Sequence, residues 1–218
     1  MPKKIEKMKD FFDKRADNYD DHMKSNIKDF NRFYSNIATE IKDTNRVINI
    51  LDIGCGTGLE LKYIFQKTPH AKIICLDLSE QMLNRLKEKY SFKNEQIELK
   101  VGSYLEDSFE ENKYDYIVSA MTLHHLRYNK KLALYKKIYK ALKSNGIYIE
   151  GDYIVDEAKE KKILNATAEK EDIKINGNYH IDLPFSINTQ KQILAESGFS
   201  KFNLIYEQDE AAVYSVFK

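Results

Sequence analysis

The chain has 218 residues, of which 32% are charged, and its formal net charge is +1. This length suits one α/β domain with a cap, and the balanced charge predicts no general attraction to nucleic acid or to a membrane surface. Residues 151–218, where we expect much of the substrate-binding part, carry 8 basic and 12 acidic groups, a net of −4. This excess of acid argues against an extended grip on a phosphate backbone, although a small contact with tRNA stays open.

The two cysteines and the apolar pattern predict a cytoplasmic protein. Cys55 and Cys75 provide neither a disulfide framework nor the spacing of a metal site, and they suit a reducing compartment. The sequence shows no apolar signal region after Met1 and no apolar run of about 18 residues. We therefore expect neither secretion nor a membrane span.

Residues 1–46 predict a layer of two or three helices packed on the core. Apolar side chains recur there at helical spacing, first at Ile5, Met8, Phe11 and Phe12, and then at Ile27, Phe30, Phe33, Tyr34, Ile37 and Ile41. A polar joint, Arg15–Asp20, separates these two stripes, and Tyr19 is its aromatic member.

The stretch Val47–Gly58 predicts a buried strand followed by a tight glycine turn. An apolar run, Val47–Leu51, leads to Asp52, and Gly54, Gly56 and Gly58 then alternate with single residues. A helical pattern starts directly afterwards and ends at Thr68-Pro69. Strand, glycine turn and helix open a nucleotide-binding α/β fold, although the spacing here differs from the G-x-G-x-x-G of dinucleotide-binding proteins.

The next strand, Lys72–Leu78, carries an acid at its end. Asp77 lies 19 residues after Gly58 (77 − 58), where a carboxylate accepts hydrogen bonds from the hydroxyls of a ribose. This position predicts nucleoside binding, but it does not distinguish a nicotinamide cofactor from S-adenosylmethionine, since both carry that ribose. Ser79 is the expected cap of a helix over Glu80–Tyr90.

The rest of the chain predicts further strands, two helices and a closing hairpin. The expected strands are Gln96–Val101, Asp115–Ala120 and Ile147–Glu150, with a helix from Leu132 to Leu142 that Asn145-Gly146 would end as a left-handed cap. Residues 156–172 are charged and helix-prone, and residues 173–186 are irregular. A helix over Asn188–Glu196, capped by Gly198, precedes a hairpin of Phe202–Tyr206 and Val213–Phe217. The long interruption suggests a lid or a binding loop.

Four stretches together resemble the class I S-adenosylmethionine-dependent methyltransferases that act on small molecules. They are R-A-D-N-Y-D from Arg15, D-I-G-C-G-T-G from Asp52, L-D-L-S-E-Q-M-L from Leu76, and L-H-H-L from Leu123. The resemblance implies a Rossmann-like α/β fold with a seven-stranded, mostly parallel sheet, an antiparallel last strand and helices on both faces. It implies a helical cap over residues 1–46, a cofactor-binding core over 47–155, a substrate lid over 156–187, and a closing helix and hairpin over 188–218.

The same resemblance implies how the cofactor is held before it becomes S-adenosylhomocysteine. Tyr19 would lie near the sulfonium, Arg15 would hold the joint or the cofactor carboxylate, and Leu78 and Met82 would pack on adenine. Ser103 stands where the family commonly has an aspartate for the adenine amino group, so a backbone amide at Tyr104 would carry more of that recognition. The remaining expected contacts come from the glycine turn and from the end of the strand at 115–120: Asp52, Gly54, Cys55, Gly56, Gly58, Ser119, Ala120 and Met121.

Methyl transfer requires orientation of the acceptor more than a conspicuous set of catalytic groups. The candidates are Tyr19, His124 as a general base, and His180 in the irregular segment, where Tyr179, Asp182 and Phe185 would also cover the substrate. Side chains of adjacent residues diverge, so we do not expect His124 and His125 to face one site, and we expect no metal. A purely structural role for His124 competes with catalysis.

Three alternatives remain beside a small-molecule methyltransferase. They are a tRNA-nucleoside methyltransferase, a nicotinamide-dependent oxidoreductase, and a non-catalytic cofactor-binding protein. The glycine spacing and the closing hairpin disfavour the oxidoreductase. The sequence after Ala120 has neither the N-P-P-Y type of tetrapeptide nor the Pro-Cys pair of DNA-modifying methylases. The acceptor and the oligomeric state are not predicted.

Overall fold

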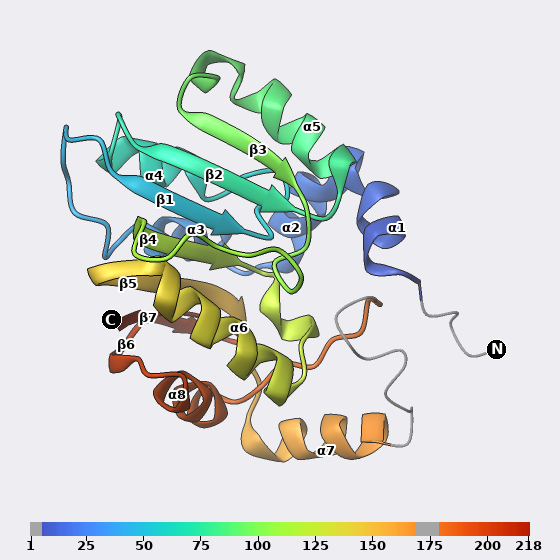
Figure 1. Ribbon diagram of the computed structural model, residues 1–218. Coiled ribbons are helices and arrows are strands. Elements are labelled where there is room, and N and C mark those ends of the chain that lie inside the picture. The colour runs from blue at the N-terminus through green and yellow to red at the C-terminus, as the bar shows by residue number, and fades with distance from the viewer. Residues whose placement is uncertain (1–5, 169–178) are drawn as a thin grey trace.

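One sheet of seven strands runs through the molecule (Figure 1). The computed structural model describes residues 6–168 and 179–218. The strand order is β3-β2-β1-β4-β5-β7-β6, and β7 runs antiparallel to both of its neighbours. The expected fold class is therefore confirmed. The strands are β1 (Asn49–Ile53), β2 (Lys72–Asp77), β3 (Ile97–Val101), β4 (Tyr114–Ala120), β5 (Leu142–Tyr153), β6 (Ser200–Gln208) and β7 (Ala211–Phe217).

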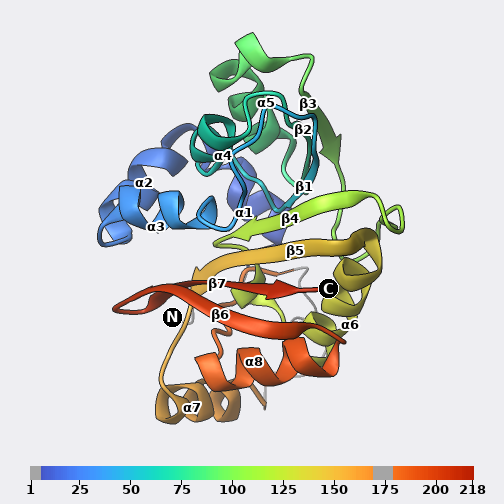
Figure 2. The same cartoon turned by 90° about the vertical axis from the view of Figure 1, so that its left-hand side faces the viewer.

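Helices cover both faces of this sheet, as Figure 2 shows edge-on. On one face lie α3 (Phe30–Ile37), α4 (Leu61–Lys67) and α5 (Glu80–Lys89), and on the other lie α6 (Tyr128–Ala141) and α8 (Ile187–Glu196). Neighbouring residues of β1 serve different faces, because Ile50 packs in the first layer and Leu51 in the second. A central parallel strand buried on both sides needs such a continuous apolar run.

The N-terminal layer lies over the edge where the strands end. It consists of α1 (Met8–Asp13), a 3-10 turn at Ala16–Asn18, α2 (Tyr19–Asn26) and α3. The Ser79 hydroxyl donates a 2.6 Å hydrogen bond to Asp13, and Arg85 forms an ion pair with Asp17. Both contacts fasten the layer to α5, whose cap Ser79 accepts from the backbone of Met82 at 3.1 Å as expected.

The predicted end of the helix before β5 and the predicted start of β5 at Ile147 are wrong. Helix α6 ends at Ala141 rather than at Asn145-Gly146, and Gly146 does not adopt a left-handed conformation. Leu142 is extended and pairs with Tyr114 of β4, so β5 begins directly at the end of the helix. The predicted cap at Gly198 is confirmed, with φ +105°.

The expected insertion contains α7 (Glu157–Ala168), and its part from 169 to 178 lies outside the described residues. Beyond it, residues 179–186 return to the strand ends. The backbone amide of His180 donates to the Glu6 carbonyl oxygen at 3.0 Å, and Lys7 and Tyr179 form an antiparallel bridge. Nowhere in the ranges 6–168 and 179–218 is there a helix with the length and apolar character to cross a membrane.

Candidate active site

The glycine turn after β1 requires glycine for geometric reasons. Gly54, Gly56 and Gly58 have φ values of +66°, +50° and +69°, in the left-handed region that other residues enter at a cost. A Cβ atom on Gly54 would lie 2.3 Å from the Thr122 side chain, so the turn packs directly against the segment after β4. A Cβ atom on Gly56 would lie 3.7 Å from the Tyr19 ring.

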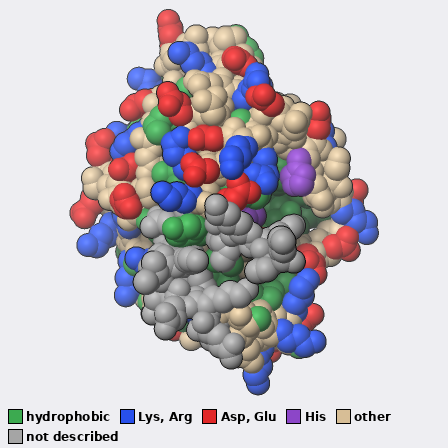
Figure 3. All heavy atoms as spheres, turned by 90° about the vertical axis from the view of Figure 1, so that its right-hand side faces the viewer, with side chains coloured by type: hydrophobic (Ala, Val, Ile, Leu, Met, Phe, Trp, Pro, Cys, Tyr) green, Lys and Arg blue, Asp and Glu red, His purple; other side chains and the backbone are tan. Residues whose placement is uncertain are grey.

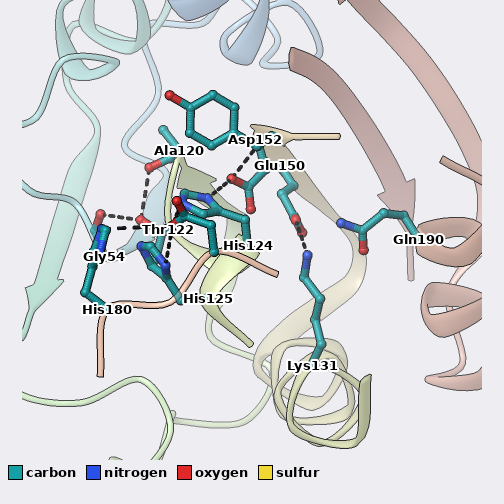
Figure 4. A network of polar contacts seen from close by, with 12 residues as sticks. Gly54, Ala120, Thr122, His124, His125, Lys131, Glu150, Asp152, His180 and Gln190 are labelled. Atoms are coloured by element: carbon teal, nitrogen blue, oxygen red, sulfur yellow. Dashed lines mark hydrogen bonds and ion pairs between the residues drawn. The ribbon is translucent and has the colours of Figure 1, made fainter. Parts of the chain in front are cut away.

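The segment after β4 is strained at the point where it reaches the site. Met121 adopts φ +52°, which is uncommon for a residue with a side chain. Its amide donates to the Gly151 carbonyl oxygen at 2.7 Å, and the Thr122 hydroxyl lies 3.0 Å from the carbonyl oxygens of Gly54 and Ala120 (Figure 4). Such strain persists where surrounding contacts fix the backbone, and it is concentrated at functional sites.

A first cavity lies between the glycine turn, the end of β2 and the N-terminal layer. Its residues are Met8, Phe12, Tyr19, Gly54, Gly56, Asp77, Leu78, Met82, Gly102, Ser103, Tyr104, Leu105, Met121, Thr122 and His125. The two oxygens of Asp77 accept 2.8 Å hydrogen bonds from the amides of Gly56 and Ser79. Each oxygen keeps a second lone pair for a ligand. Burial raises the pKa of Asp77 to about 6, and the backbone donors of Ser79 and Gly56 limit that rise.

A second cavity adjoins the first beneath α1 and α2. It is lined by Phe11, Phe12, Lys14, Arg15, Asn18, Tyr19, His22, Met23, Met121, His124, His125, Tyr153, His180 and Asp182. Figure 3 shows hydrophobic side chains at the bottom of a hollow on this side of the molecule, beside a histidine. Four residues line both cavities: Phe12, Tyr19, Met121 and His125.

The histidines of the second cavity form a cluster with two aspartates. His124 Nδ1 lies 2.6 Å from Asp152 Oδ1, and both side chains are buried (Figure 4). The rings of His124 and His125 are 4.0 Å apart, and both approach Asp182. The expectation that adjacent histidines cannot face one site is therefore wrong. The 3-10 turn Leu123–His125 and the length of the imidazole arms bring both rings to the same carboxylate.

Charge and burial lower the pKa of three groups in this cluster, which favours a neutral histidine and ionised aspartates. Burial lowers the pKa of His125 to about 4, and the neighbouring His124 contributes to the same effect. The hydrogen bond with His125 lowers the pKa of Asp182 to about 2. Burial opposes ionisation of Asp152, but His124 holds the pKa of its carboxyl below the usual value. Neutral pH thus leaves an ionised Asp182 beside a neutral His125.

Most of the predicted cofactor residues meet in the first cavity, and the predicted catalytic residues meet in the second. The first contains Tyr19, Gly54, Gly56, Asp77, Leu78, Met82, Ser103, Tyr104 and Met121; the second contains Arg15, Tyr19, Met121, His124 and His180. The side chain of Ser103 accepts from the Leu105 amide at 3.3 Å. Burial raises the pKa of the Tyr104 phenol.

Several expected residues lie elsewhere. The predicted cofactor residues that line neither cavity are Asp52, Cys55, Gly58, Ser119 and Ala120, and Tyr179, predicted to cover the substrate, lines neither cavity as well. Asp52 is fully buried, and burial together with Glu60 raises its pKa well above the usual value. Phe185 does not cover the second cavity, because it is buried in the layer of α6, within reach of Lys131 and Tyr128.

Sequence reasoning missed several residues that line the cavities or support them, five of which matter most here. Met8 and Phe12 come from α1, Thr122 and His125 from the turn after β4, and Asp152 from β5. The sequence carried a signal for Asp152, because Glu150 and Asp152 are acids at alternate positions of the otherwise uncharged and largely apolar stretch 147–153. Such acids need buried partners.

The comparisons with known proteins point to methyltransferases. A family model described as a methyltransferase domain matches residues 50–146. Carboxy-S-adenosyl-L-methionine synthase of Nautilia profundicola is 24% identical over 233 residues, covering 99% of this chain and 97% of that protein. Malonyl-[acyl-carrier protein] O-methyltransferase 2 of Ilyobacter polytropus is 36% identical over 109 residues, covering 50% of this chain and 40% of that protein.

Solved structures share the fold. The structure of the DhpI–SAH complex matches with a TM-score of 0.71 at 13% identity, covering 95% of this chain and 93% of that chain. Several other matching chains are longer, and this chain spans between 50% and 68% of the length of five of them.

Proposed function

Since this chain belongs to the class I S-adenosylmethionine-dependent methyltransferases, we propose that it methylates a small molecule bound in the second cavity. Its cofactor is S-adenosylmethionine. When bound, this cofactor supplies a methyl group that its positive sulfur has already activated for displacement.

The residues of the first cavity fit such a cofactor. Asp77 is fixed by two backbone amides and offers its free lone pairs to ribose hydroxyls. Leu78 and Met82 provide an apolar wall suited to adenine. The missing side chain of Gly56 leaves the ring of Tyr19 open to the cavity, and the face of a tyrosine ring attracts a cation.

The shared wall of the two cavities is the observation that carries the proposal. Phe12, Tyr19, Met121 and His125 line both cavities, so they surround the place where a donor in the first cavity meets an acceptor in the second. The backbone strain at Met121 lies at this boundary. Holding two reactants in a near-attack geometry is worth roughly 7–11 kcal/mol in favourable cases.

The second cavity favours an acceptor with both an apolar body and a polar group. Phe11, Phe12 and Met23 provide apolar contacts, while the histidine cluster and Arg15 provide polar ones. Asp152 accepts the Nδ1 proton of His124, so the Nε2 lone pair of a neutral His124 faces the cavity. That lone pair can either accept a proton or bind a metal ion.

The similarity over the full length of the Nautilia protein supports a second candidate. A carboxy-S-adenosyl-L-methionine synthase, by its name, makes a carboxylated form of the cofactor, and the match covers 97% of that protein. The two activities leave different products. Methyl transfer yields S-adenosylhomocysteine, whereas the synthase activity yields a cofactor that keeps its positive sulfur and gains a carboxylate.

An assay with S-adenosylmethionine labelled in its methyl group tests the proposal. The protein is incubated with panels of phenols, hydroxy acids and amines as methyl acceptors, and separately with carboxylic acids that can lose carbon dioxide and so act as carboxyl donors. The cofactor product and the second reactant are both analysed by mass spectrometry. We expect S-adenosylhomocysteine together with a labelled acceptor. A carboxylated cofactor would select the second candidate, and bound but unconverted cofactor across all panels would contradict both. The cytoplasmic location remains part of this proposal.

A further inference from the structure

Three side chains in the wall of the second cavity converge on one point. His124 Nε2 lies 3.7 Å from Asp182 Oδ1, and His125 Nδ1 lies 3.3 Å from the same oxygen. One ligand atom from each of the three residues falls within 4.8 Å of the others. We propose that His124, His125 and Asp182 form a binding site for a divalent transition-metal ion, with zinc as the best match.

The spacing of these atoms suits zinc. With zinc–ligand bonds of about 2.0–2.1 Å, the ligands of a tetrahedral site lie roughly 3.3 Å apart. The separations of His125 Nδ1 and His124 Nε2 from Asp182 Oδ1, 3.3 Å and 3.7 Å, differ from this value by at most a few tenths of an ångström. Two imidazoles and one carboxylate form a ligand set that zinc takes in catalytic sites, where the fourth position stays open.

The partner of His124 is a second and independent observation. Asp152 is buried and lies 2.6 Å from Nδ1, which directs Nε2 toward Asp182. Histidine ligands of metals almost always donate a hydrogen bond from their other ring N–H to a carboxylate or a carbonyl in this way. The arrangement fixes the tautomer that a metal on Nε2 needs.

The backbone also holds the third ligand in place. The Leu183 amide donates to the His124 carbonyl oxygen at 2.6 Å, directly beside Asp182. His125 Nδ1 lies 3.2 Å from the Ile181 carbonyl oxygen, a contact that an ion bound to this nitrogen would replace. His180 stacks on Phe11 with ring centroids 3.5 Å apart, and its Nε2 is 3.9 Å from Asp182.

A role for the ion rests on the proposed function, whereas its binding does not. The open position would face the second cavity and take a hydroxyl or carboxylate oxygen of the acceptor. A hydroxyl bound to zinc loses its proton to water more readily. The resulting oxygen anion forms the new C–O bond as the methyl C–S bond breaks, and the electron pair of that bond stays on sulfur.

Cobalt(II) is the probe for this site, because its visible spectrum reports bound ligands while zinc is silent. The full-length protein, treated with a chelator and without cofactor, is titrated with Co²⁺ and then with Zn²⁺ in competition. We expect one Co²⁺ per chain, with the visible bands of a tetrahedral or five-coordinate ion, and displacement by Zn²⁺.

Variants distinguish this site from adventitious binding. Asp182→Asn and His124→Gln should weaken Co²⁺ binding at least tenfold, and Asp152→Asn should weaken it by about 10–100-fold. Asp182 is 59% exposed, so its substitution leaves the core intact. His70→Gln is the matched control, since His70 is an exposed histidine that lines neither cavity.

Equal Co²⁺ affinity in Asp182→Asn, His124→Gln and the control, or no binding to the native protein, would overturn the metal site. The methyl-transfer assay separates this result from a failure of the proposed function. If methyl transfer persists after chelation and Co²⁺ does not bind, the metal site is refuted and the proposed function is not. If Co²⁺ binds but no methyl transfer is found, the metal site is supported and its role in methyl transfer is refuted.

Discussion

The Asp77→Asn substitution tests the proposed cofactor site at its most constrained side chain. Asp77 accepts one hydrogen bond at each oxygen, from Gly56 and from Ser79. Asparagine offers one acceptor oxygen and one NH₂ group, so one of these backbone donors would face another donor. We expect the substitution to reduce the free energy of unfolding by about 1–3 kcal/mol, the usual cost of an unsatisfied buried group.

The same substitution should also lower the affinity for the cofactor. Hydrogen bonds to a charged group contribute about 1.5–3 kcal/mol, so loss of the carboxylate should weaken S-adenosylhomocysteine binding by roughly 10–150-fold. Calorimetric titration measures the affinity, and urea unfolding measures the stability. Asp21→Asn is the control, because Asp21 is an exposed acid on α2 with its side chain 85% accessible. Affinity within twofold of the native value, in a folded variant, would refute the role of Asp77 in ribose binding.

The pH dependence has a definite sign. Burial raises the pKa of Asp77 to about 6, so this carboxyl is ionised at pH 7 and mostly protonated at pH 5. If binding needs the carboxylate, S-adenosylhomocysteine affinity should fall about tenfold from pH 7 to pH 5, and Asp77→Asn should abolish this dependence. The stability of the ligand-free protein depends on pH in the opposite sense, because the folded state binds the Asp77 proton more tightly than the unfolded state does. This group therefore contributes stability at low pH that is lost as the pH rises toward 6.

Three further substitutions probe the glycine turn, the shared wall and the core. Gly56→Ala should lower the free energy of unfolding by about 1 kcal/mol, because residue 56 has a φ of +50°. It should also weaken S-adenosylhomocysteine binding at least tenfold in calorimetry, because the new Cβ atom would face Tyr19. Unchanged affinity would contradict a role of the glycine turn in cofactor binding. Tyr19→Ala should lower kcat in a protein that still folds, with a lower melting temperature because Tyr19 packs against the core, while Tyr19→Phe keeps most activity. Equal rates for the native protein and Tyr19→Ala would remove Tyr19 from the site. Lys131→Met should lower the free energy of unfolding by about 3–5 kcal/mol in urea, since Lys131 and Glu150 face each other 3.2 Å apart with no exposed surface (Figure 4); a loss below 1 kcal/mol would mean that Glu150 does not depend on this partner.

The local features of the proposed cofactor site could be predicted from the sequence. Three alternating glycines and an acid at the end of the next strand restrict the backbone whatever packs around them. This is why Gly54, Gly56 and Asp77 meet where they were expected. Asp52 shows the limit of the same pattern, because it lies within β1 between two core residues, and its side chain is buried beside Glu60 instead of lining a cavity.

Features that depend on packing could not be predicted in the same way. Which face of α1 closes the site is decided by contacts with α5 and with His180, far away in the sequence. The end of α6 depends on the pairing of Leu142 with Tyr114, which overrides the glycine signal at Gly146. The 3-10 turn at His124 and His125 joins two side chains that a simple alternation rule would separate.

A crystal structure of the protein with S-adenosylhomocysteine would test the two-cavity arrangement. We expect the ribose hydroxyls on Asp77, the adenine beside Leu78 and Met82, and the sulfur at the wall formed by Phe12, Tyr19, Met121 and His125. A sulfur atom directed away from the second cavity, or a ribose without contact to Asp77, would contradict methyl transfer to an acceptor bound there.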